Sequence, residues 1–438
     1  MERGIILMDI LLITLKSVAY LLTNPFSVIV LLLLSLILYR KNRKTIIMQK
    51  MIIGQRVSTA FELTISEVVL GIFAGTVASL IMSYLGIFFN EDSAIYLMFL
   101  ISMFFMLFNP RFICFSYSGA ALGIMSLIFI NMATLLNMPQ LNFIKIDIPA
   151  LMSMVAILHL VEGILVMIDG DRGHVPVFTN REDKIIGGFV LQRYWILPIA
   201  FMLMLNNQSI SNISQSGSPM PNWWPLLKSD IPSNVLKVAV MSLTCFYGVI
   251  GYNSVTFTKT RKEKKFISGL YIIVYSLLLF MLSRLALMNT LLKVVVLIFA
   301  PAGHEAMIYI QKYFELRGKP RYVSTEEGIM VLDVAKDSIA NKMGIKSGDL
   351  LLQVNDKEID SEEDIVKSIG QMYGHISFKI RNDVGRLKTV KYPVLTSYEK
   401  LGIVFVPKNI PKSTSVIKVK SEKFQDILEK IKNKDKDE

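Results

Sequence analysis

Long apolar runs before residue 310 constrain this chain more than any other feature of its sequence. A helix needs about 20 apolar residues to cross the hydrocarbon core of a bilayer, and the first two thirds of the 438 residues contain several runs of nearly that length. Soluble domains have about 25% charged residues, whereas here 19% are charged and 53% are apolar. We therefore expect an integral membrane protein in direct contact with the lipid bilayer.

The apolar runs predict about nine transmembrane helices, so the fold expected for residues 1–310 is an all-α polytopic membrane bundle. The predicted spans are 25–39, 65–89, 94–109, 112–136, 148–168, 186–205, 235–257, 266–283 and 287–304. Segment 5–22 contains Asp9 and Lys16. It either crosses the bilayer or lies in its interface, and we expect the interfacial position.

The distribution of basic residues predicts the orientation. Of the formal net charge of +12, about +10 lies before residue 321, because 321–438 contains 21 Lys and Arg against 19 Asp and Glu. The predicted loops that would lie on one side carry 15 basic residues and those on the other side carry 3. Cytoplasmic loops carry the excess of Lys and Arg, so we expect a cytoplasmic C-terminal domain. The basic charge is then a topology signal, and nucleic acid is not an expected partner.

Ionisable side chains are few within the predicted spans. Those in or beside the spans include Glu67, His159, Glu162, Lys237, Arg284 and Lys293. His159 and Glu162 are three residues apart on one helical face, and a buried hydrogen-bonded pair is favoured over a metal or proton-relay site. Cys114 and Cys245 both fall in apolar runs and are expected to be inert.

Two pairs of glycines have the spacing of close helix contacts in membranes. They are Gly71 with Gly75 and Gly119 with Gly123. Small residues four positions apart let two helix backbones approach each other. We therefore expect these glycines to pack against neighbouring helices rather than to line a pore.

An intramembrane metalloprotease is the enzyme class that this organisation suggests. That chemistry needs two histidines one helical turn apart and a glutamate beside the first. The chain has His304 followed by Glu305, but Ile308 stands at the position of the second histidine. No nucleophile elbow or phosphate-binding loop is present either. We therefore expect no enzymatic activity, no catalytic residue, no metal ligand and no cofactor.

From residue 328 the sequence changes to short alternating runs separated by turn residues. Asp-Ser-Ile-Ala at 337–340, Met-Gly-Ile at 343–345, Gly-Asp at 348–349 and Val-Asn at 354–355 occur in the order typical of a PDZ domain. The resemblance implies a small β-rich α+β domain over 321–407, with a second helix at 361–370. A charged C-terminal tail, 408–438, follows it.

PDZ domains bind an extended peptide between a strand and the second helix, and a loop of backbone N–H groups holds the terminal carboxylate. No such loop precedes residue 328, but Leu-Gly-Ile-Val-Phe-Val follows the last predicted strand at 401–406. We therefore predict a circularly rearranged order in which 401–406 supplies the loop and the edge strand. A plain closing strand is the alternative. The predicted groove residues are Leu401, Gly402, Ile403, Val404, Phe405, Ile365 and Ile369, with Ile403 and Phe405 opposite the two helix isoleucines.

A multi-span region followed by a PDZ domain resembles the MinJ-like family of cell-division topology proteins. Three further stretches carry the likeness: Asn24-Pro25-Phe26, the run 170–178 that includes His174, and Ala300-Pro301-Ala302-Gly303-His304-Glu305. The resemblance implies a non-enzymatic scaffold that brings a DivIVA-like coiled-coil protein and a MinD-like ATPase to the cell poles and septum. The loop around His174 is expected to be a solvated connection, with a second docking surface as the alternative.

Two other functions are weighed against this scaffold. An inactive relative or regulatory partner of a PDZ-containing membrane protease is the alternative, because the same PDZ class occurs in such proteases. A transporter is disfavoured because paired intramembrane charges are scarce.

Overall fold

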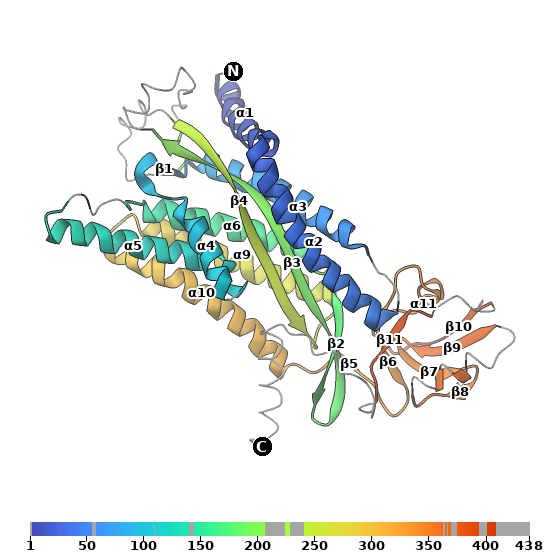
Figure 1. Cartoon of the computed structure of the whole chain (residues 1–438). Coiled ribbons are helices and arrows are strands. Elements are labelled where there is room, and N and C mark those ends of the chain that lie inside the picture. Colours follow the sequence, from blue (N-terminus) through green and yellow to red (C-terminus); the bar gives the residue numbers. More distant parts are fainter. Residues whose placement is uncertain are drawn as a thin grey trace.

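The computed structural model describes most of the chain, and Figure 1 gives its arrangement. The described residues are 2–54, 58–108, 110–138, 140, 144–205, 224–227, 241–361, 364–365, 367–368, 375–393 and 401–408. Lys237, Ile369 and the tail beyond residue 408 lie outside them.

Within these ranges, six helices are long and apolar enough to cross a membrane. They are α2 (Pro25–Ile53), α3 (Ala60–Leu85), α5 (Phe115–Leu135), α6 (Ile148–Asp169), α9 (Arg261–Leu285) and α10 (Thr290–Arg317). The prediction of a helical membrane part followed by a C-terminal β-rich domain is confirmed.

Shorter or less apolar elements complete the helical part. They are α1 (Glu2–Thr23), α4 (Leu97–Phe108) and the 3₁₀ turns η1 (Glu91–Ser93) and η2 (Pro110–Ile113). The Asn24 side chain caps α2 by accepting hydrogen bonds from the amides of Phe26 and Ser27, and Pro25 fills the first helical position. These are the preferred residues at a helix start, so α1 and α2 are separate helices.

The prediction of transmembrane helices at 186–205 and 235–257 is wrong, because both segments contain long strands. Strand β3 (Lys184–Met204) pairs antiparallel with β4 (Met241–Thr256), from Phe189 opposite Thr256 to Met204 opposite Met241. The mean hydropathy of an apolar run does not distinguish a buried strand from a helix. The run in β3 contains Gly187, Gly188 and Pro198, and a proline inside a helix costs about 3 kcal/mol.

β3 is the central strand of a five-stranded sheet. β2 (Val175–Arg181) and β5 (Tyr322–Val323) pair antiparallel with its beginning, and β1 (Phe88–Asn90) pairs parallel with its end. The hydroxyl of Tyr247 in β4 donates to the carbonyl of Leu21 in α1 at 3.2 Å, so α1 lies against β4.

Glycines allow α3 to lie directly on this sheet. A Cβ atom at Gly71 would come within 2.2 Å of the carbonyl oxygen of Ile196, and one at Gly75 within 2.4 Å of that of Pro198. The expected helix partner of this pair is therefore wrong, since the partner is strand β3. Gly119 and Gly123 do face helices, with Val155 of α6 and Leu297 of α10 as their neighbours.

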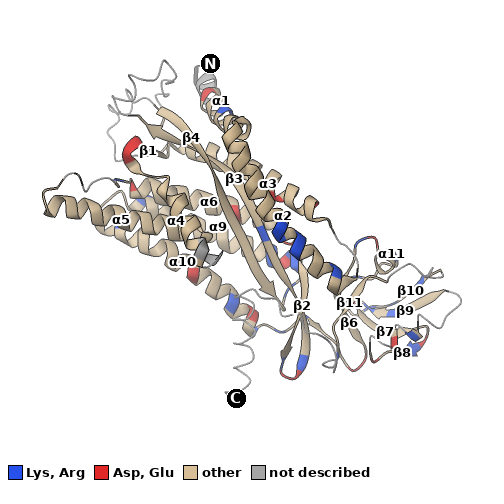
Figure 2. Ribbon diagram, in the orientation of Figure 1, with Lys and Arg blue, Asp and Glu red and all other residues tan. Residues whose placement is uncertain are grey.

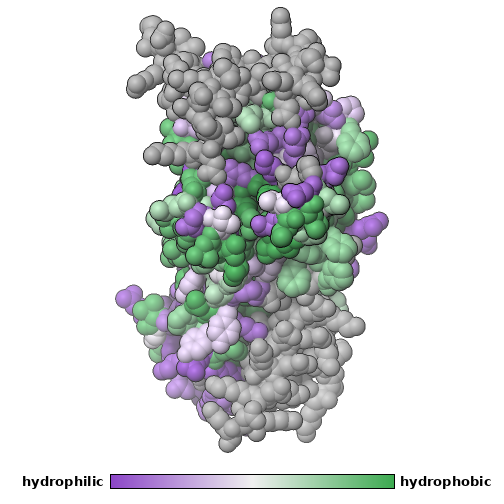
Figure 3. Space-filling view, turned by 90° about the vertical axis from the view of Figure 1, so that its left-hand side faces the viewer, coloured by the Kyte–Doolittle hydropathy of each residue, from purple (hydrophilic) through white to green (hydrophobic). Residues whose placement is uncertain are grey.

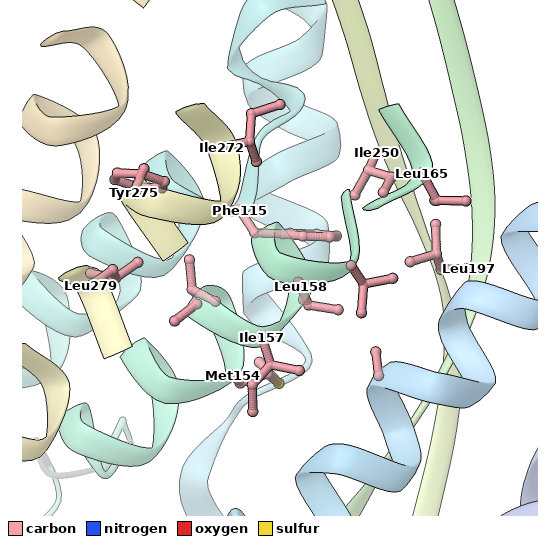
Figure 4. Packing of buried hydrophobic residues seen from close by; sticks show 14 of the residues in the cluster. Phe115, Met154, Ile157, Leu158, Leu165, Leu197, Ile250, Ile272, Tyr275 and Leu279 are labelled. Atoms are coloured by element: carbon pink, nitrogen blue, oxygen red, sulfur yellow. The ribbon is translucent and has the colours of Figure 1, made fainter. Parts of the chain in front are cut away.

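The apolar core lies between the strand hairpin and helices α6 and α9. Figure 4 shows Leu165 of α6 near Leu197 of β3 and Ile250 of β4, while Ile272 and Leu279 come from α9. All of these side chains are buried. Large apolar side chains are also exposed on the outer helices, among them Phe26, Leu32, Phe73, Met281 and Leu291. Figure 3 shows apolar residues gathered across the middle of one face, as expected of a surface in lipid.

The contact between α3 and β3 predicts the effect of adding one methyl group. Gly71→Ala should destabilise the protein by about 1–3 kcal/mol, because the new Cβ meets backbone that cannot move aside. Thermal unfolding of the full chain in detergent measures this. Val69→Ala is the matched control, since Val69 is 57% exposed on the same helix. Equal stability of the two variants would contradict the contact.

Candidate peptide-binding site

The C-terminal domain is a six-stranded sheet in which β10, β9, β7, β6 and β11 are neighbours in that order and β8 pairs with β7. Its elements are β6 (Ile329–Val334), α11 (Ile339–Lys342), β7 (Leu350–Val354), β8 (Lys357–Glu358), β9 (Ile376–Arg381), β10 (Leu387–Tyr392) and β11 (Ile403–Phe405). Val331, Leu351, Val354 and Phe378 are fully buried at its centre. The domain therefore has an apolar core of its own.

Turn residues of the sequence motif set the path between β6 and β7. The Ser338 hydroxyl caps α11 by accepting from the amide of Asn341 at 3.2 Å. Gly344 and Gly348 have φ of 80° and 95°, which glycine adopts most easily. The Asp349 carboxylate accepts from the amide of Lys346 at 2.8 Å, which closes the turn into β7. These contacts explain why the motif has Ser, Gly and Gly-Asp at these positions.

β11 lies at the end of the sheet order, where the rearranged PDZ order needs its edge strand. It pairs antiparallel with β6, with Ile403 opposite Val334 and Val404 opposite Asp333. Its edge away from β6 pairs with no strand among the described residues. The predicted peptide would add to this edge as a further strand.

The loop that enters β11 is held by its carbonyl groups. The carbonyl of Leu401 accepts from the amide of Ala340 at 3.2 Å, and that of Gly402 accepts from Ala335 at 2.8 Å. Gly402 has a φ of 70°, a left-handed conformation that favours glycine. Hydrogen bonding alternates along an antiparallel strand, so the backbone of Ile403 is directed towards the outer edge. That this loop binds a peptide carboxylate stays a prediction.

Side chains of β11 alternate between two cores. Phe405 is buried with Ile365 in the core of the C-terminal domain, and Ile403 and Leu401 pack against the same core. The structure therefore brings these predicted groove residues together. Val404 points the other way and is buried, with Val406, in the core of the membrane part. Its side chain therefore cannot line the groove, and Ile369 lies outside the described residues.

A buried ionic contact attaches the C-terminal domain to the membrane part. His174 Nε2 lies 2.8 Å from Asp333 Oδ2 of β6, and Arg261 of α9 lies 3.3 Å from Asp333 Oδ1. Gln49 of α2 donates to the carbonyl of His174 at 2.6 Å. His174 is 6% exposed, so the expected solvated connection is wrong. We call Asp333, His174 and Arg261 the docking triad.

The docking triad controls the ionisation of its carboxylate. Burial alone would raise the pKa of Asp333, but His174 and Arg261 beside it outweigh burial and hold that pKa below its usual value. Asp333 is therefore ionised at neutral pH.

Close packing beside the triad completes the attachment. A Cβ atom at Gly187 would lie 2.8 Å from Val406 and 2.9 Å from Leu332, so the sheet of the C-terminal domain touches the start of β3. The amide of Arg321 donates to the carbonyl of Phe257 at 2.9 Å. Figure 2 shows Lys and Arg residues along α2 near this junction. The C-terminal domain is thus fixed at the basic end of the membrane part.

Sequence reasoning missed a second buried ionic group, which lies inside the membrane part. Arg193 of β3 is 1% exposed and lies 3.0 Å from Glu67 of α3. Its Nε donates to Asp169 of α6 at 2.8 Å. Asn42 of α2 donates to Glu67 at 2.6 Å. We call Arg193, Glu67 and Asp169 the buried ionic cluster. Glu67 is fully buried in it.

A group of possible metal ligands was also missed. Ligand atoms of Cys114, His159 and His304 all lie within 4.8 Å of one another. The three residues are far apart in the sequence, so no local spacing indicates them. The expectation of no metal ligand is based on spacing within single helices, which these three residues do not share.

Comparison with known proteins identifies one part of the chain. Residues 330–391 match the family model described as a PDZ domain. No curated protein and no solved structure matches the chain. The PDZ resemblance of the C-terminal domain is therefore confirmed, and the chain combines this protein-interaction domain with membrane-spanning helices.

The position of β11 predicts which substitutions affect peptide binding. Ile403→Lys should weaken the binding of peptides with an apolar C-terminal residue at least about tenfold, or about 1.4 kcal/mol, because it places a charge beside the groove. Fluorescence polarisation with such peptides on the full chain measures this, and amidation of the peptide carboxylate should have a similar effect. Val384→Lys is the control, because Val384 is 78% exposed in the turn between β9 and β10. Unchanged binding by Ile403→Lys would refute the groove.

A pH-dependent stability follows from the docking triad. The pKa of Asp333 is lowered in the folded protein, so its stabilising contribution is complete above the unfolded value of about 3.9 and is lost as the pH falls below it. Asp333→Asn should cost on the order of 1–3 kcal/mol at neutral pH. It should also flatten the acid side of the stability curve measured by thermal unfolding. Asp360→Asn is the control, because the Asp360 side chain is 88% exposed in its pair with Lys408. A wild-type curve matching that of Asp333→Asn would argue against the triad.

Proposed function

We propose that this protein is a membrane-anchored adaptor that binds C-terminal peptides of partner proteins at the cytoplasmic membrane surface. The observation that carries the proposal is the double use of β11. One face of the strand belongs to the PDZ core and the other, through Val404 and Val406, belongs to the core of the membrane part. A peptide added to its free edge would therefore be held at a fixed place on the membrane protein.

The distribution of charge supports a cytoplasmic PDZ domain. The docking triad joins the PDZ domain to the loop that contains His174 and to the basic start of α9 at Arg261. Both segments belong to the set of loops that carries the excess of Lys and Arg. Gln49, near the basic end of α2, contacts the carbonyl of His174 at 2.6 Å, so loops of this set lie together beside the PDZ domain, which supports the expected orientation.

The MinJ-like resemblance of the sequence names the partners that we propose. They are a DivIVA-like coiled-coil protein and a MinD-like ATPase, recruited to poles and septum through the PDZ domain and the cytoplasmic loops. The adaptor role requires no chemistry within the membrane. Ile308 stands one turn after His304 on α10, so this helix does not carry the two-histidine zinc motif of a metalloprotease.

An inactive relative or regulatory partner of a membrane protease is the second candidate. It is favoured by the position of His304 and Glu305 inside the helical part, where Tyr117 contacts both side chains. Such a protein would use the same groove to bind protease substrates. The two candidates therefore differ in the partner that occupies the groove.

Fluorescent tagging of the full chain in its own cells separates the two. The adaptor should be enriched at septa and poles, and the enrichment should disappear when the DivIVA-like protein is removed. Ile403→Lys should release the partners that use the groove, whereas Val384→Lys should release none. A uniform membrane signal that does not respond to the DivIVA-like protein would contradict the division role, and co-purification of a protease would favour the second candidate.

A further inference from the structure

Three metal-ligand side chains converge inside the helical part from three separate segments. Cys114 immediately precedes α5, His159 lies in the middle of α6, and His304 lies in the middle of α10. Cys114 Sγ is 3.0 Å from His159 Nε2, and the imidazole rings of His159 and His304 have centroids 5.7 Å apart. His159 is 1% exposed and His304 8%. The two histidines are therefore enclosed by protein, whereas Cys114 is half-buried. We call this group the Cys-His-His cluster.

Hydrogen bonds from outside the cluster orient both histidines as ligands. His159 Nδ1 lies 2.7 Å from the carbonyl of Val155. A carbonyl only accepts, so Nδ1 carries the proton and Nε2 is the acceptor nitrogen; it faces Cys114 Sγ at 3.0 Å and Ser116 Oγ at 3.1 Å. Ligating histidines in metal sites are usually held through their other nitrogen in this way.

His304 is oriented through Tyr117. The Tyr117 hydroxyl donates its one proton to Glu305, and its oxygen lies 3.3 Å from His304 Nδ1. That oxygen must then accept from Nδ1–H, which leaves His304 Nε2 unprotonated. Both imidazoles are therefore fixed in the tautomer that offers Nε2 to a metal.

Distances and charge in the cluster suit Zn²⁺. Zinc bond lengths of about 2.3 Å to sulfur and 2.0–2.1 Å to nitrogen place tetrahedral ligand atoms about 3.3–3.6 Å apart. The separations in the cluster, from 3.0 Å to at most 4.8 Å, bracket this range. Glu162 Oε2 lies 3.9 Å from His159 Nε2. The Cys114 thiolate and the nearby carboxyl group of Glu162 would offset the charge of one Zn²⁺ in this site.

We propose that the Cys-His-His cluster binds one Zn²⁺ ion, with Cys114 Sγ and the Nε2 atoms of His159 and His304 as its protein ligands. The ion would join the start of α5 to the middles of α6 and α10. Figure 4 shows that Phe115, next to Cys114, and Tyr275 lie in this packed interior. Its role would be to hold the helices that carry the docked PDZ domain.

Metal content and a cobalt spectrum of the full chain test this site. The purified wild-type protein in detergent, reconstituted with Zn²⁺ and passed through a desalting column, should retain about one zinc per chain by mass spectrometry. Cys114→Ser should lower the affinity at least about tenfold in competition with a chromophoric chelator. Co²⁺ bound to the wild type should show a thiolate-to-cobalt charge-transfer band that is absent in Cys114→Ser.

Matched variants separate metal binding from folding. Serine is a good helix cap and can replace the contact from Cys114 Sγ to the amide of Ser116, so Cys114→Ser should elute as the wild type does in size exclusion. Cys245→Ser and His375→Gln change a cysteine and a histidine outside the cluster and should bind zinc normally. Tyr117→Phe should weaken zinc binding by about tenfold or more through the loss of the His304 contact. Absence of zinc in the reconstituted wild type, or equal zinc in Cys114→Ser, would overturn the proposal.

Discussion

The side chain of Arg193 places a guanidinium in the interior of the membrane part, and its neighbours must neutralise it. Leaving such a charge buried and unpaired costs several kcal/mol. Glu67 of α3 and Asp169 of α6 supply the two carboxylates, and Trp195 of β3 donates to Asp169 at 3.2 Å. Because Arg193 is part of the longest strand, these bonds fix where α3 and the end of α6 lie along the hairpin. The glycine contacts of α3 with Ile196 and Pro198 depend on the same placement.

The position of the PDZ domain follows from that placement. Asp169 ends α6, and the next turn brings Asp171 to Lys265 of α9 at 2.6 Å. His174 then reaches Asp333 of the PDZ domain. Three polar contacts, Asp169 with Arg193, Asp171 with Lys265 and His174 with Asp333, therefore connect the interior of the membrane part to β6, which pairs with the proposed peptide-binding strand. A substitution in residues 169–174 would therefore affect β6 directly, and through β6 the position of its neighbour β11.

Local patterns predicted the parts of this fold that depend on local physics. Apolar runs identified the six long helices, and the spacing of Ser338, Gly344 and Gly348 identified the PDZ domain. The helix prediction for 186–205 and 235–257 was wrong because hydropathy measures apolar content and not backbone geometry. The residues in 186–205 that argue against a helix are Gly187, Gly188 and Pro198. The docking triad, the buried ionic cluster and the Cys-His-His cluster each join residues from distant segments. The spacing of residues along the sequence does not show such contacts. A search for two histidines on one helix also does not find a group such as Cys114, His159 and His304, which come from three segments.

A docked PDZ domain constrains its partners differently from one on a flexible linker. A flexible linker lets the domain sample many positions, which lowers the effective concentration of its groove at any one place on the membrane. Here the side chains of Val404 and Val406 are buried in the core of the membrane part. A peptide would therefore add to the outer edge of β11, which pairs with no strand among the described residues. A peptide that adds to that edge is positioned relative to the helices as well as to the PDZ domain. Selection of a partner then depends on whether the rest of that partner fits against the basic end of the membrane part, in addition to the sequence of its C-terminal peptide.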